Sequence, residues 1–361
     1  MHPRSTESRS SSRDATVPRS WRGDLRAPAT VRELGHVLPA LALLWVPVVI
    51  AVWARLPGAA DLERGVPMLR AMLIGGLAPL LVAGGIARLR ARSLSGAARL
   101  LWSEGWLTER PVRHLLMSVS FAAFFWAFAC WKSAIPLVNR FSWDERLWSL
   151  DAWLHRGQPD VLLAPLFGGP RTIVVLEQLY ETWWLVQFAL LLWQIWQPDL
   201  AKAKRFLLAY ALAWIVLGIF VATAFSSAGP CYAGLITGTH RYDELLARLD
   251  AANALAPLTT LRGQAYLWAA YVRQVVPPGG GISAFPSLHV AAVVLGAIAI
   301  HERSRALGVL AWVYLALIWI GSIMLGWHYA LDGTVAILGA LACWWVAGSL
   351  TKRNPVVGLN P

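Results

Sequence analysis

Apolar residues gather in eight stretches along the chain, separated by polar connections of very unequal length. Each stretch approaches the roughly 20 residues that a helix needs to cross a bilayer. Lone strands would leave backbone N–H and C=O groups unpaired in lipid, so the pattern predicts helices as the spanning elements. The predicted spans cover residues 37–55, 67–87, 114–131, 172–196, 206–226, 287–301, 306–325 and 329–350.

The composition supports a membrane location. Hydrophobic residues make up 57% of the 361 residues and charged residues only 14%, whereas a soluble domain carries about 25% charged residues to cover its surface. The 21 tryptophans are typical of a protein with many residues at membrane–water interfaces. We therefore expect an all-α polytopic membrane protein. Its net charge of +12 then reflects cytoplasmic loops, and no nucleic-acid partner is expected.

Basic residues indicate the orientation of these spans. Compact basic clusters occupy both tails and every even-numbered connection, at 4–32, 88–113, 202–205, 303–305 and 352–353. With eight spans all of these lie on one side of the membrane, which the positive-inside rule makes cytoplasmic. Residues 1–34 then form a disordered basic tail and residues 351–361 a second cytoplasmic tail. The odd connections, near 56–66, 132–171, 227–286 and 326–328, face outward, and we expect a bacterial plasma membrane.

Two histidines stand at the outward ends of predicted spans. His289 follows Gly279–Gly281 and the segment SAFPSL, and His328 precedes Asp332 by four residues. Residues four apart share one face of a helix, so the carboxylate of Asp332 can orient the imidazole of His328 as in a catalytic triad. An ionisable residue inside a span is costly, which makes it a functional hypothesis by default.

The segments around these histidines resemble the signatures of a known enzyme family. FPSLHVA (285–291) and GWHYALD (326–332) resemble the second and third signatures of the type 2 phosphatidic acid phosphatase superfamily. FPSLH resembles the form of the second signature in the branch that contains the fungal inositol phosphorylceramide synthases. The phosphatases usually have PSGH at these positions. SSAGPCY (226–232) resembles a further segment of that branch.

The resemblance covers roughly residues 114–350. It implies a six-helix phosphatidic-acid-phosphatase-type core at 113–350, preceded by two additional transmembrane helices and a cytoplasmic loop at 35–112. It also implies a lipid phosphate, pyrophosphate or phosphodiester as substrate, in contact with the bilayer, and water or an alcohol as acceptor. The enzyme is then either a phosphoric ester hydrolase or an inositolphosphotransferase-like phosphotransferase.

The same resemblance implies a covalent phosphohistidine mechanism without a metal or another cofactor. His328, held by Asp332, is the expected nucleophile. His289 is expected to protonate the leaving oxygen and then to deprotonate the acceptor. Ser287 and backbone amides at the start of the sixth span are expected to hold phosphoryl oxygens at the positive end of the helix.

Part of the phosphatase pattern is missing. Gly321 and Ser322 stand where the third signature has Ser-Arg, and Lys132 and Arg140 do not have the spacing of the first signature. The loss of these cations favours the transferase branch. Another cation must neutralise the phosphate, and a guanidinium binds phosphate with two hydrogen bonds. The candidates are three arginines of the long outer loop: Arg241, Arg262 and Arg273.

Further polar residues lie in or near the outward side. A glutamate in hydrocarbon is costly, so Glu181 is expected to face the bundle interior. Tyr180, Glu181 and Tyr232 are possible headgroup or acceptor contacts. Asp144, Asp151 and Arg156, in the third connection, are expected mainly to coat the surface.

Two alternatives remain open from the sequence. Two histidines and an aspartate can also bind zinc, and activity in a strong chelator would separate this hypothesis from the covalent one. A transporter or a non-catalytic membrane protein is the other alternative. Transporters often carry internal repeats and midplane sites, whereas this chain shows no repeat and its polar cluster lies at one interface.

Overall fold

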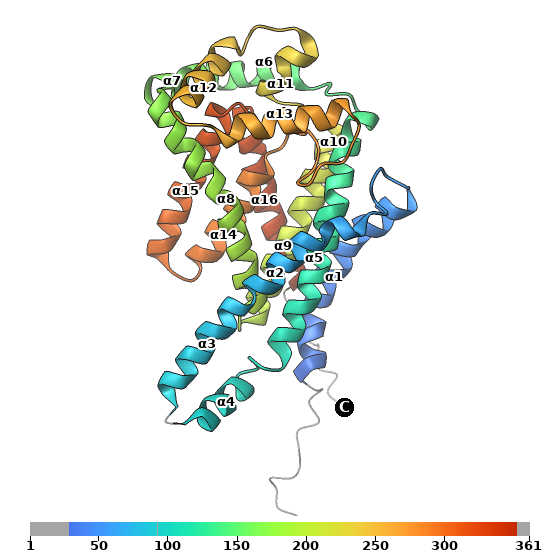
Figure 1. Cartoon of the computed structure of the whole chain (residues 1–361), viewed down its shortest axis with the longest axis vertical. Coiled ribbons are helices and arrows are strands. Elements are labelled where there is room, and N and C mark those ends of the chain that lie inside the picture. Colours follow the sequence, from blue (N-terminus) through green and yellow to red (C-terminus); the bar gives the residue numbers. More distant parts are fainter. Residues whose placement is uncertain (1–28, 92, 352–361) are drawn as a thin grey trace, which may run out of the picture.

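The structure is a computed structural model that describes residues 29–91 and 93–351, and every regular element in that part is a helix (Figure 1). The predicted tails at 1–28 and 352–361 lie outside the described residues. The first helix, α1, begins at Ala29, so the prediction of disorder was wrong for residues 29–34. This helix extends the predicted first span toward the N-terminus.

Long helices account for most of the bundle. α9 (Leu200–Ile215) continues through a π-helical segment (Val216–Val221) into the short α10 (Ala222–Ala224), and α2 (Val66–Gly75) leads directly into α3 (Leu77–Arg90). The other long helices are α1 (Ala29–Trp53), α5 (Glu109–Val138), α8 (Pro170–Trp196), α9 (Leu200–Ile215), α14 (Leu288–His301), α15 (Arg305–Met324) and α16 (Ala330–Thr351).

The apolar helices confirm the all-α polytopic class. In the described part of the chain, five helices are long and apolar enough to cross a membrane, or six if the bent pair of α7 (Pro159–Phe167) and α8 counts as one span. Two shorter apolar helices, Leu38–Trp53 and Leu288–His301, add to them. Each of the eight stretches that the sequence predicts falls mainly on one of these segments.

Helix α14 lies in the middle of the bundle and contacts α8, α9, α15 and α16. Its sequence, LHVAAVVLGAIAIH, is rich in Ala, Gly and Val, and such small residues let neighbouring helix backbones approach closely. At Gly296 an added Cβ would lie 2.5 Å from a methyl group of Leu190 on α8. The small side chains therefore fix how close α14 comes to its neighbours.

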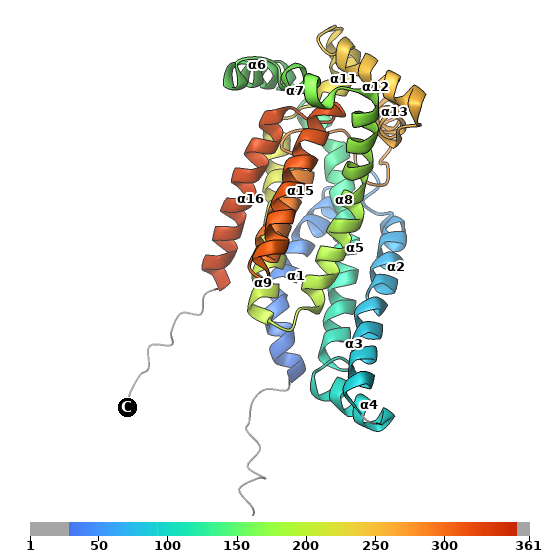
Figure 2. The same ribbon diagram turned by 90° about the vertical axis from the view of Figure 1, so that its left-hand side faces the viewer.

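A cap of short helices covers one end of the bundle (Figures 1 and 2). These helices are α6 (Asp144–His155), α7 (Pro159–Phe167), α11 (Pro230–Thr237), α12 (Asp243–Leu255) and α13 (Thr259–Val272). We call them the helical cap. α7 turns into α8 through a bend of 106°, and both α14 and α16 begin beneath the cap.

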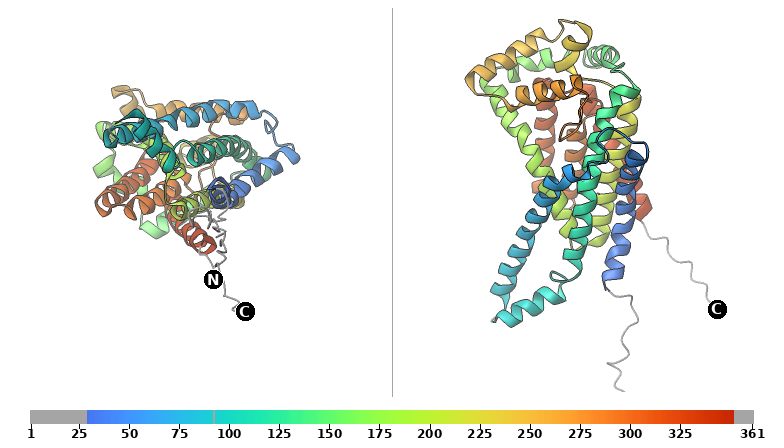
Figure 3. Two further views of the ribbon diagram at one scale, coloured as in Figure 1. Left: turned by 90° about the horizontal axis from the view of Figure 1, so that it is seen from below. Right: turned by 45° about the vertical axis from the view of Figure 1, so that its right-hand side comes forward.

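The opposite end carries α4 (Leu94–Ser103) and the turn between α14 and α15. α1 begins and α16 ends there as well (Figure 2). α1 packs on α5 and α9, and α2 packs on α5, whereas α3 and α4 diverge from the bundle (Figure 3). Only 17% of the most apolar window of the α2–α3 segment is buried, so most of its surface is left for lipid.

The basic clusters at 88–113, 202–205 and 303–305 lie at this opposite end, away from the helical cap. We therefore predict that the cap and residues 326–328 are non-cytoplasmic and that both termini are cytoplasmic. Alkaline-phosphatase and fluorescent-protein fusions after residues 92, 157, 240 and 327 measure this orientation. Phosphatase activity is expected for the last three fusions and fluorescence for the first. A cytoplasmic position of residue 327 would refute the topology.

Candidate active site

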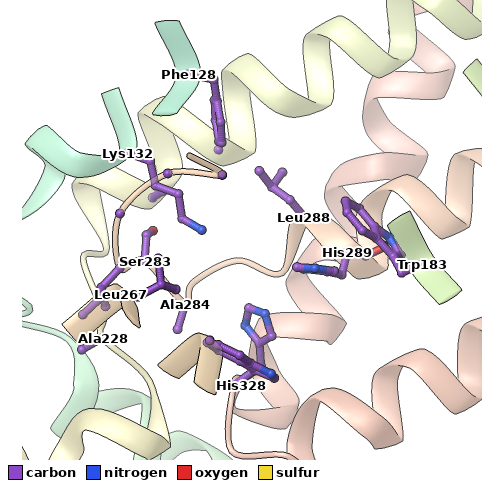
Figure 4. A pocket seen from close by; sticks show the side chains of 18 of the residues that line it. Phe128, Lys132, Trp183, Ala228, Leu267, Ser283, Ala284, Leu288, His289 and His328 are labelled. Atoms are coloured by element: carbon purple, nitrogen blue, oxygen red, sulfur yellow. The ribbon is translucent and has the colours of Figure 1, made fainter. Parts of the chain in front are cut away.

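A cavity of about 300 Å³ lies between the bundle and the helical cap. Its walls come from α5, α8, α9 and α13, from the loop 278–284 and from the starts of α14 and α16. Figure 4 shows Lys132, His289 and His328 pointing into this space from three different elements. The predicted histidines therefore meet in one cavity.

The separation of the two imidazoles suits the transfer of a group that is bound in the space between them. The ring centroids of His289 and His328 are 6.2 Å apart. Nδ1 of His328 lies 3.1 Å from Oδ2 of the fully buried Asp332, and the same oxygen accepts the backbone N–H of Tyr329 at 3.1 Å. Because Nδ1 contacts the carboxylate, Nε2 is the nitrogen of His328 left for chemistry.

His289 packs against aromatic rings of α8. Trp183 donates its indole N–H to the carbonyl of His289 at 3.0 Å, and the rings of Trp183 and His289 lie 4.0 Å apart. The ring of Tyr180 stacks against His289 at 5.2 Å. These contacts from α8 fix the orientation of His289 at the start of α14.

Two buried carboxylates of α6 hold the loops that carry the site. Asp144 accepts hydrogen bonds from the hydroxyl of Ser227, the backbone N–H groups of Ala228 and Gly229, and the hydroxyl of Tyr329, at 2.7–3.0 Å. Asp151 accepts the N–H groups of Ala330 and Leu331, both at 2.8 Å. These two donors are free amides of the first turn of α16, which a helix cannot satisfy itself.

The expectation that Asp144 and Asp151 coat the surface was therefore wrong. Their side chains are buried, with relative exposures of 6% and 1%, whereas Arg156 is exposed as expected. Burial raises the pKa of Asp151 above its ordinary value, and the N–H groups of Ala330 and Leu331 oppose that rise. The sequence did not show which residues lie opposite α6 in the fold.

Glycines let the backbone reach the site at two positions. Gly326, in the turn before His328, has a φ of +75°, a conformation that side chains rarely adopt. At Gly281 an added Cβ would lie 2.7 Å from Cα of Ser133 on α5. The loop 279–281 can therefore pass directly against the helix that carries Lys132.

The cation in the cavity is one that the sequence patterns did not identify. Among the described residues, Lys132 is the one Lys or Arg that lines the cavity, and its amine points toward the histidines (Figure 4). The signal was available in the sequence: Lys132 is an ammonium near the outward end of an apolar helix, where a charge is costly. Only the fold shows that the glycine loop and both histidines surround it.

The three predicted arginines lie elsewhere. Arg262 and Arg273 are exposed on and after α13, and Arg262 donates to the hydroxyl of Thr259 at 3.1 Å. Arg241 forms an ion pair with Glu145 and stacks over the ring of Trp148; the hydrogen bond from Arg241 lowers the pKa of Glu145. None of the three lines the cavity within the described part of the chain.

The other predicted residues divide between the cavity wall and its support. Tyr180, Glu181 and Tyr232 line the cavity, and the hydroxyl of Tyr232 donates to the carbonyl of Gln264 at 3.0 Å. Ser287 is fully buried as the N-cap of α14. Its hydroxyl accepts the N–H of Val290 at 3.5 Å, while its neighbours Pro286 and Leu288 line the cavity.

The hypothesis of a zinc site would need a cluster of metal ligands around His289, His328 and Asp332. Among residues 29–91 and 93–351, no three His, Cys, Asp or Glu side chains come together in a way that could hold a metal ion.

Comparison with known proteins adds the family. A family model described as the PAP2 superfamily matches residues 145–346, more than half of the chain. The chain belongs to the PAP2 superfamily. No curated protein and no solved structure matches it. Membership of the PAP2 superfamily, a family of membrane phosphatases, makes this chain in general terms a lipid phosphatase or phosphotransferase and an integral, multi-pass membrane protein.

The role of Asp151 can be measured as stability. We predict that Asp151→Ala lowers the free energy of unfolding by about 2–4 kcal/mol, because two buried N–H groups at the start of α16 lose their charged acceptor. Thermal unfolding of the purified protein in detergent measures the loss. Asp250→Ala, on the exposed side of α12, is the matched control and should be neutral. Equal melting temperatures of the two variants would contradict the proposed support.

Proposed function

We propose that this protein is a phosphotransferase that moves a phosphoryl-linked group from a lipid phosphodiester to an alcohol through a phosphohistidine intermediate. The observation that carries the proposal is the pair of imidazoles, 6.2 Å apart, which face the same cavity as Lys132. Water is the competing acceptor and would make the enzyme a phosphatase or phosphodiesterase.

The reaction follows from the geometry. Nε2 of His328 attacks phosphorus, and the bond from phosphorus to the leaving oxygen breaks as that oxygen takes a proton from His289. The acceptor hydroxyl then gives its proton to His289, its oxygen attacks phosphorus, and the phosphorus–nitrogen bond breaks to restore His328. Asp332 orients the imidazole and stabilises its positive charge in the intermediate.

The charge of the cavity supports a phosphodiester as the donor. A phosphomonoester carries about 1.5–2 negative charges at neutral pH, and a phosphodiester carries one. Lys132 supplies one positive charge, and the arginine of the third signature is replaced by Ser322. A single ammonium matches a single negative charge, so a phosphodiester costs less to desolvate here than a dianion.

Two further arguments support the transferase type and the membrane face. The FPSLH form resembles the inositol phosphorylceramide synthase branch, which also tends to lack the signature arginine. The basic clusters lie away from the cavity end of the bundle, so the positive-inside rule favours an active site on the non-cytoplasmic side of a bacterial plasma membrane.

The three catalytic residues should fail in different ways. We predict that His328→Ala abolishes phosphoryl transfer, because His328 is the one histidine of the described cavity whose imidazole is oriented by a carboxylate. His289→Ala should be slow with ordinary donors and much less impaired with a p-nitrophenyl ester, whose leaving oxygen needs no proton. Asp332→Asn should reduce kcat by about 10⁴-fold, as in other triads. Steady-state kinetics with both donors measures these effects.

Rapid acid or base quench tests the intermediate directly. Labelled phosphate that is acid-labile and base-stable should appear on the wild-type protein and on His289→Ala. Undiminished label on His328→Ala would show that another residue is the nucleophile. Activity that disappears in EDTA and returns with zinc would instead revive the metal hypothesis.

Lys132 offers a test of phosphate binding. We predict that Lys132→Met lowers kcat/KM for a phosphodiester by about 10²–10³-fold, the loss typical for one preorganised charge donor. Lys132→Arg should retain part of the activity. The control is Lys202→Met, at the exposed start of α9. A Lys132→Met enzyme with wild-type kinetics would remove Lys132 from the mechanism.

The acceptor is identified by the products. Purified protein should be incubated with labelled phosphodiester lipids, with and without lipid alcohols. A labelled new phosphodiester identifies a transferase, and labelled phosphate or headgroup phosphate that forms with water alone identifies a hydrolase. The absence of both would revive the transport hypothesis.

A further inference from the structure

The cavity contains two opposite charges that do not neutralise each other. Lys132 on α5 and Glu181 on α8 both line it. Within the described residues neither side chain has an ion-pair or hydrogen-bond partner. Glu181 is half-buried, and a carboxylate in a largely apolar wall is stabilised by a nearby positive charge, which no described residue supplies to it.

The wall around Glu181 is aromatic. Trp184 follows Glu181 by three residues and so shares its side of α8, and it packs at 4.9 Å against Trp183, edge to face. Trp327 and Tyr266 line the same cavity, and Trp327 lies directly beneath Gly263 of α13. Trp184 and Tyr266 are about half exposed, at 51% and 50%, so their rings are accessible.

Aromatic faces together with a carboxylate are the surroundings that bind organic cations. The negative face of an indole ring attracts a quaternary ammonium, and this attraction strengthens when water is displaced. A polyol headgroup would instead need several side chains able to form hydrogen bonds to its hydroxyls. Trp184 and Tyr266 line the cavity together with Glu181, and these aromatic rings favour a cation over a polyol.

We infer that the donor is a zwitterionic phosphodiester lipid whose headgroup carries a quaternary ammonium. Lys132 binds the phosphodiester charge beside the two histidines, and Glu181 with Trp184 binds the ammonium. This inference rests on the proposed function, since it names the donor of that reaction.

The decisive experiment compares two lipids of the same shape. The donors are phosphatidylcholine and its carbon isostere, the 3,3-dimethylbutyl phosphodiester, which lacks the positive charge. Purified full-length protein in mixed micelles should turn over phosphatidylcholine with a kcat/KM at least about tenfold higher, because only the charged headgroup gains from the rings and the carboxylate. Phosphatidylinositol, the polyol donor, should resemble the isostere.

Variants assign this preference to residues. Glu181→Gln and Trp184→Leu should each bring the ratio of the two kcat/KM values close to one, because the attraction to the positive charge is lost for phosphatidylcholine. Matched controls are Glu244→Gln and Trp153→Leu, which alter exposed residues of α12 and α6 away from the cavity. Both controls should keep the wild-type ratio.

The outcomes separate the two proposals. Equal turnover of both lipids, a preference for phosphatidylinositol, or a preference that survives Glu181→Gln overturns the zwitterion site. If only bis(p-nitrophenyl) phosphate is hydrolysed, and His328 is required, the function stands and the headgroup assignment is wrong. If no His328-dependent reaction exists, calorimetric binding to the His328→Ala protein decides the site. Tighter binding of phosphocholine than of 3,3-dimethylbutyl phosphate supports it, and equal binding overturns it.

Discussion

The site depends on one constraint: polar backbone groups at the capped end of the bundle must find acceptors away from water. Asp144 and Asp151 meet it. Asp144 accepts four hydrogen bonds from the loop 227–229 and Tyr329, and Asp151 accepts the first amides of α16. Because these donors flank His328, the two carboxylates that complete the fold also set the position of the proposed nucleophile.

The fold and the contact between His328 and Asp332 could be predicted because both depend on local patterns. Eight apolar stretches of spanning length give eight helical segments, and His328 and Asp332, four residues apart, meet in the structure at 3.1 Å. The residues that sequence reasoning missed depend on contacts between distant segments. Asp151 contacts residues near 330, and Lys132 reaches the histidines only because the glycine loop at 279–281 passes against α5. The spacing of hydrophobic residues along the chain does not predict such contacts between distant segments.

The three candidate arginines lie outside the cavity lining for a physical reason. Chemistry alone makes Arg241, Arg262 and Arg273 suitable for phosphate, but two are exposed and the third pairs with Glu145. An arginine at the aqueous surface is already solvated by water or paired with a carboxylate. It therefore gains little by extending into the cavity. Lys132 belongs to the apolar helix α5, and the cavity provides polar surroundings for its ammonium group. Position relative to the bilayer was therefore a better guide than side-chain chemistry to the cation that lines the cavity.

The small residues of α14 have a consequence for how this site diversifies. His289 is in the first turn of α14 and His328 lies just before α16, and these two helices pack against each other. The space between the imidazoles is thus an interhelical distance, which varies with the side chains at the crossing. Exchange of alanine, glycine or valine deep in the bundle would widen or narrow the gap without touching either histidine. Substitutions of such buried residues, which do not contact the acceptor, would therefore change the size of the acceptor that the site can accommodate.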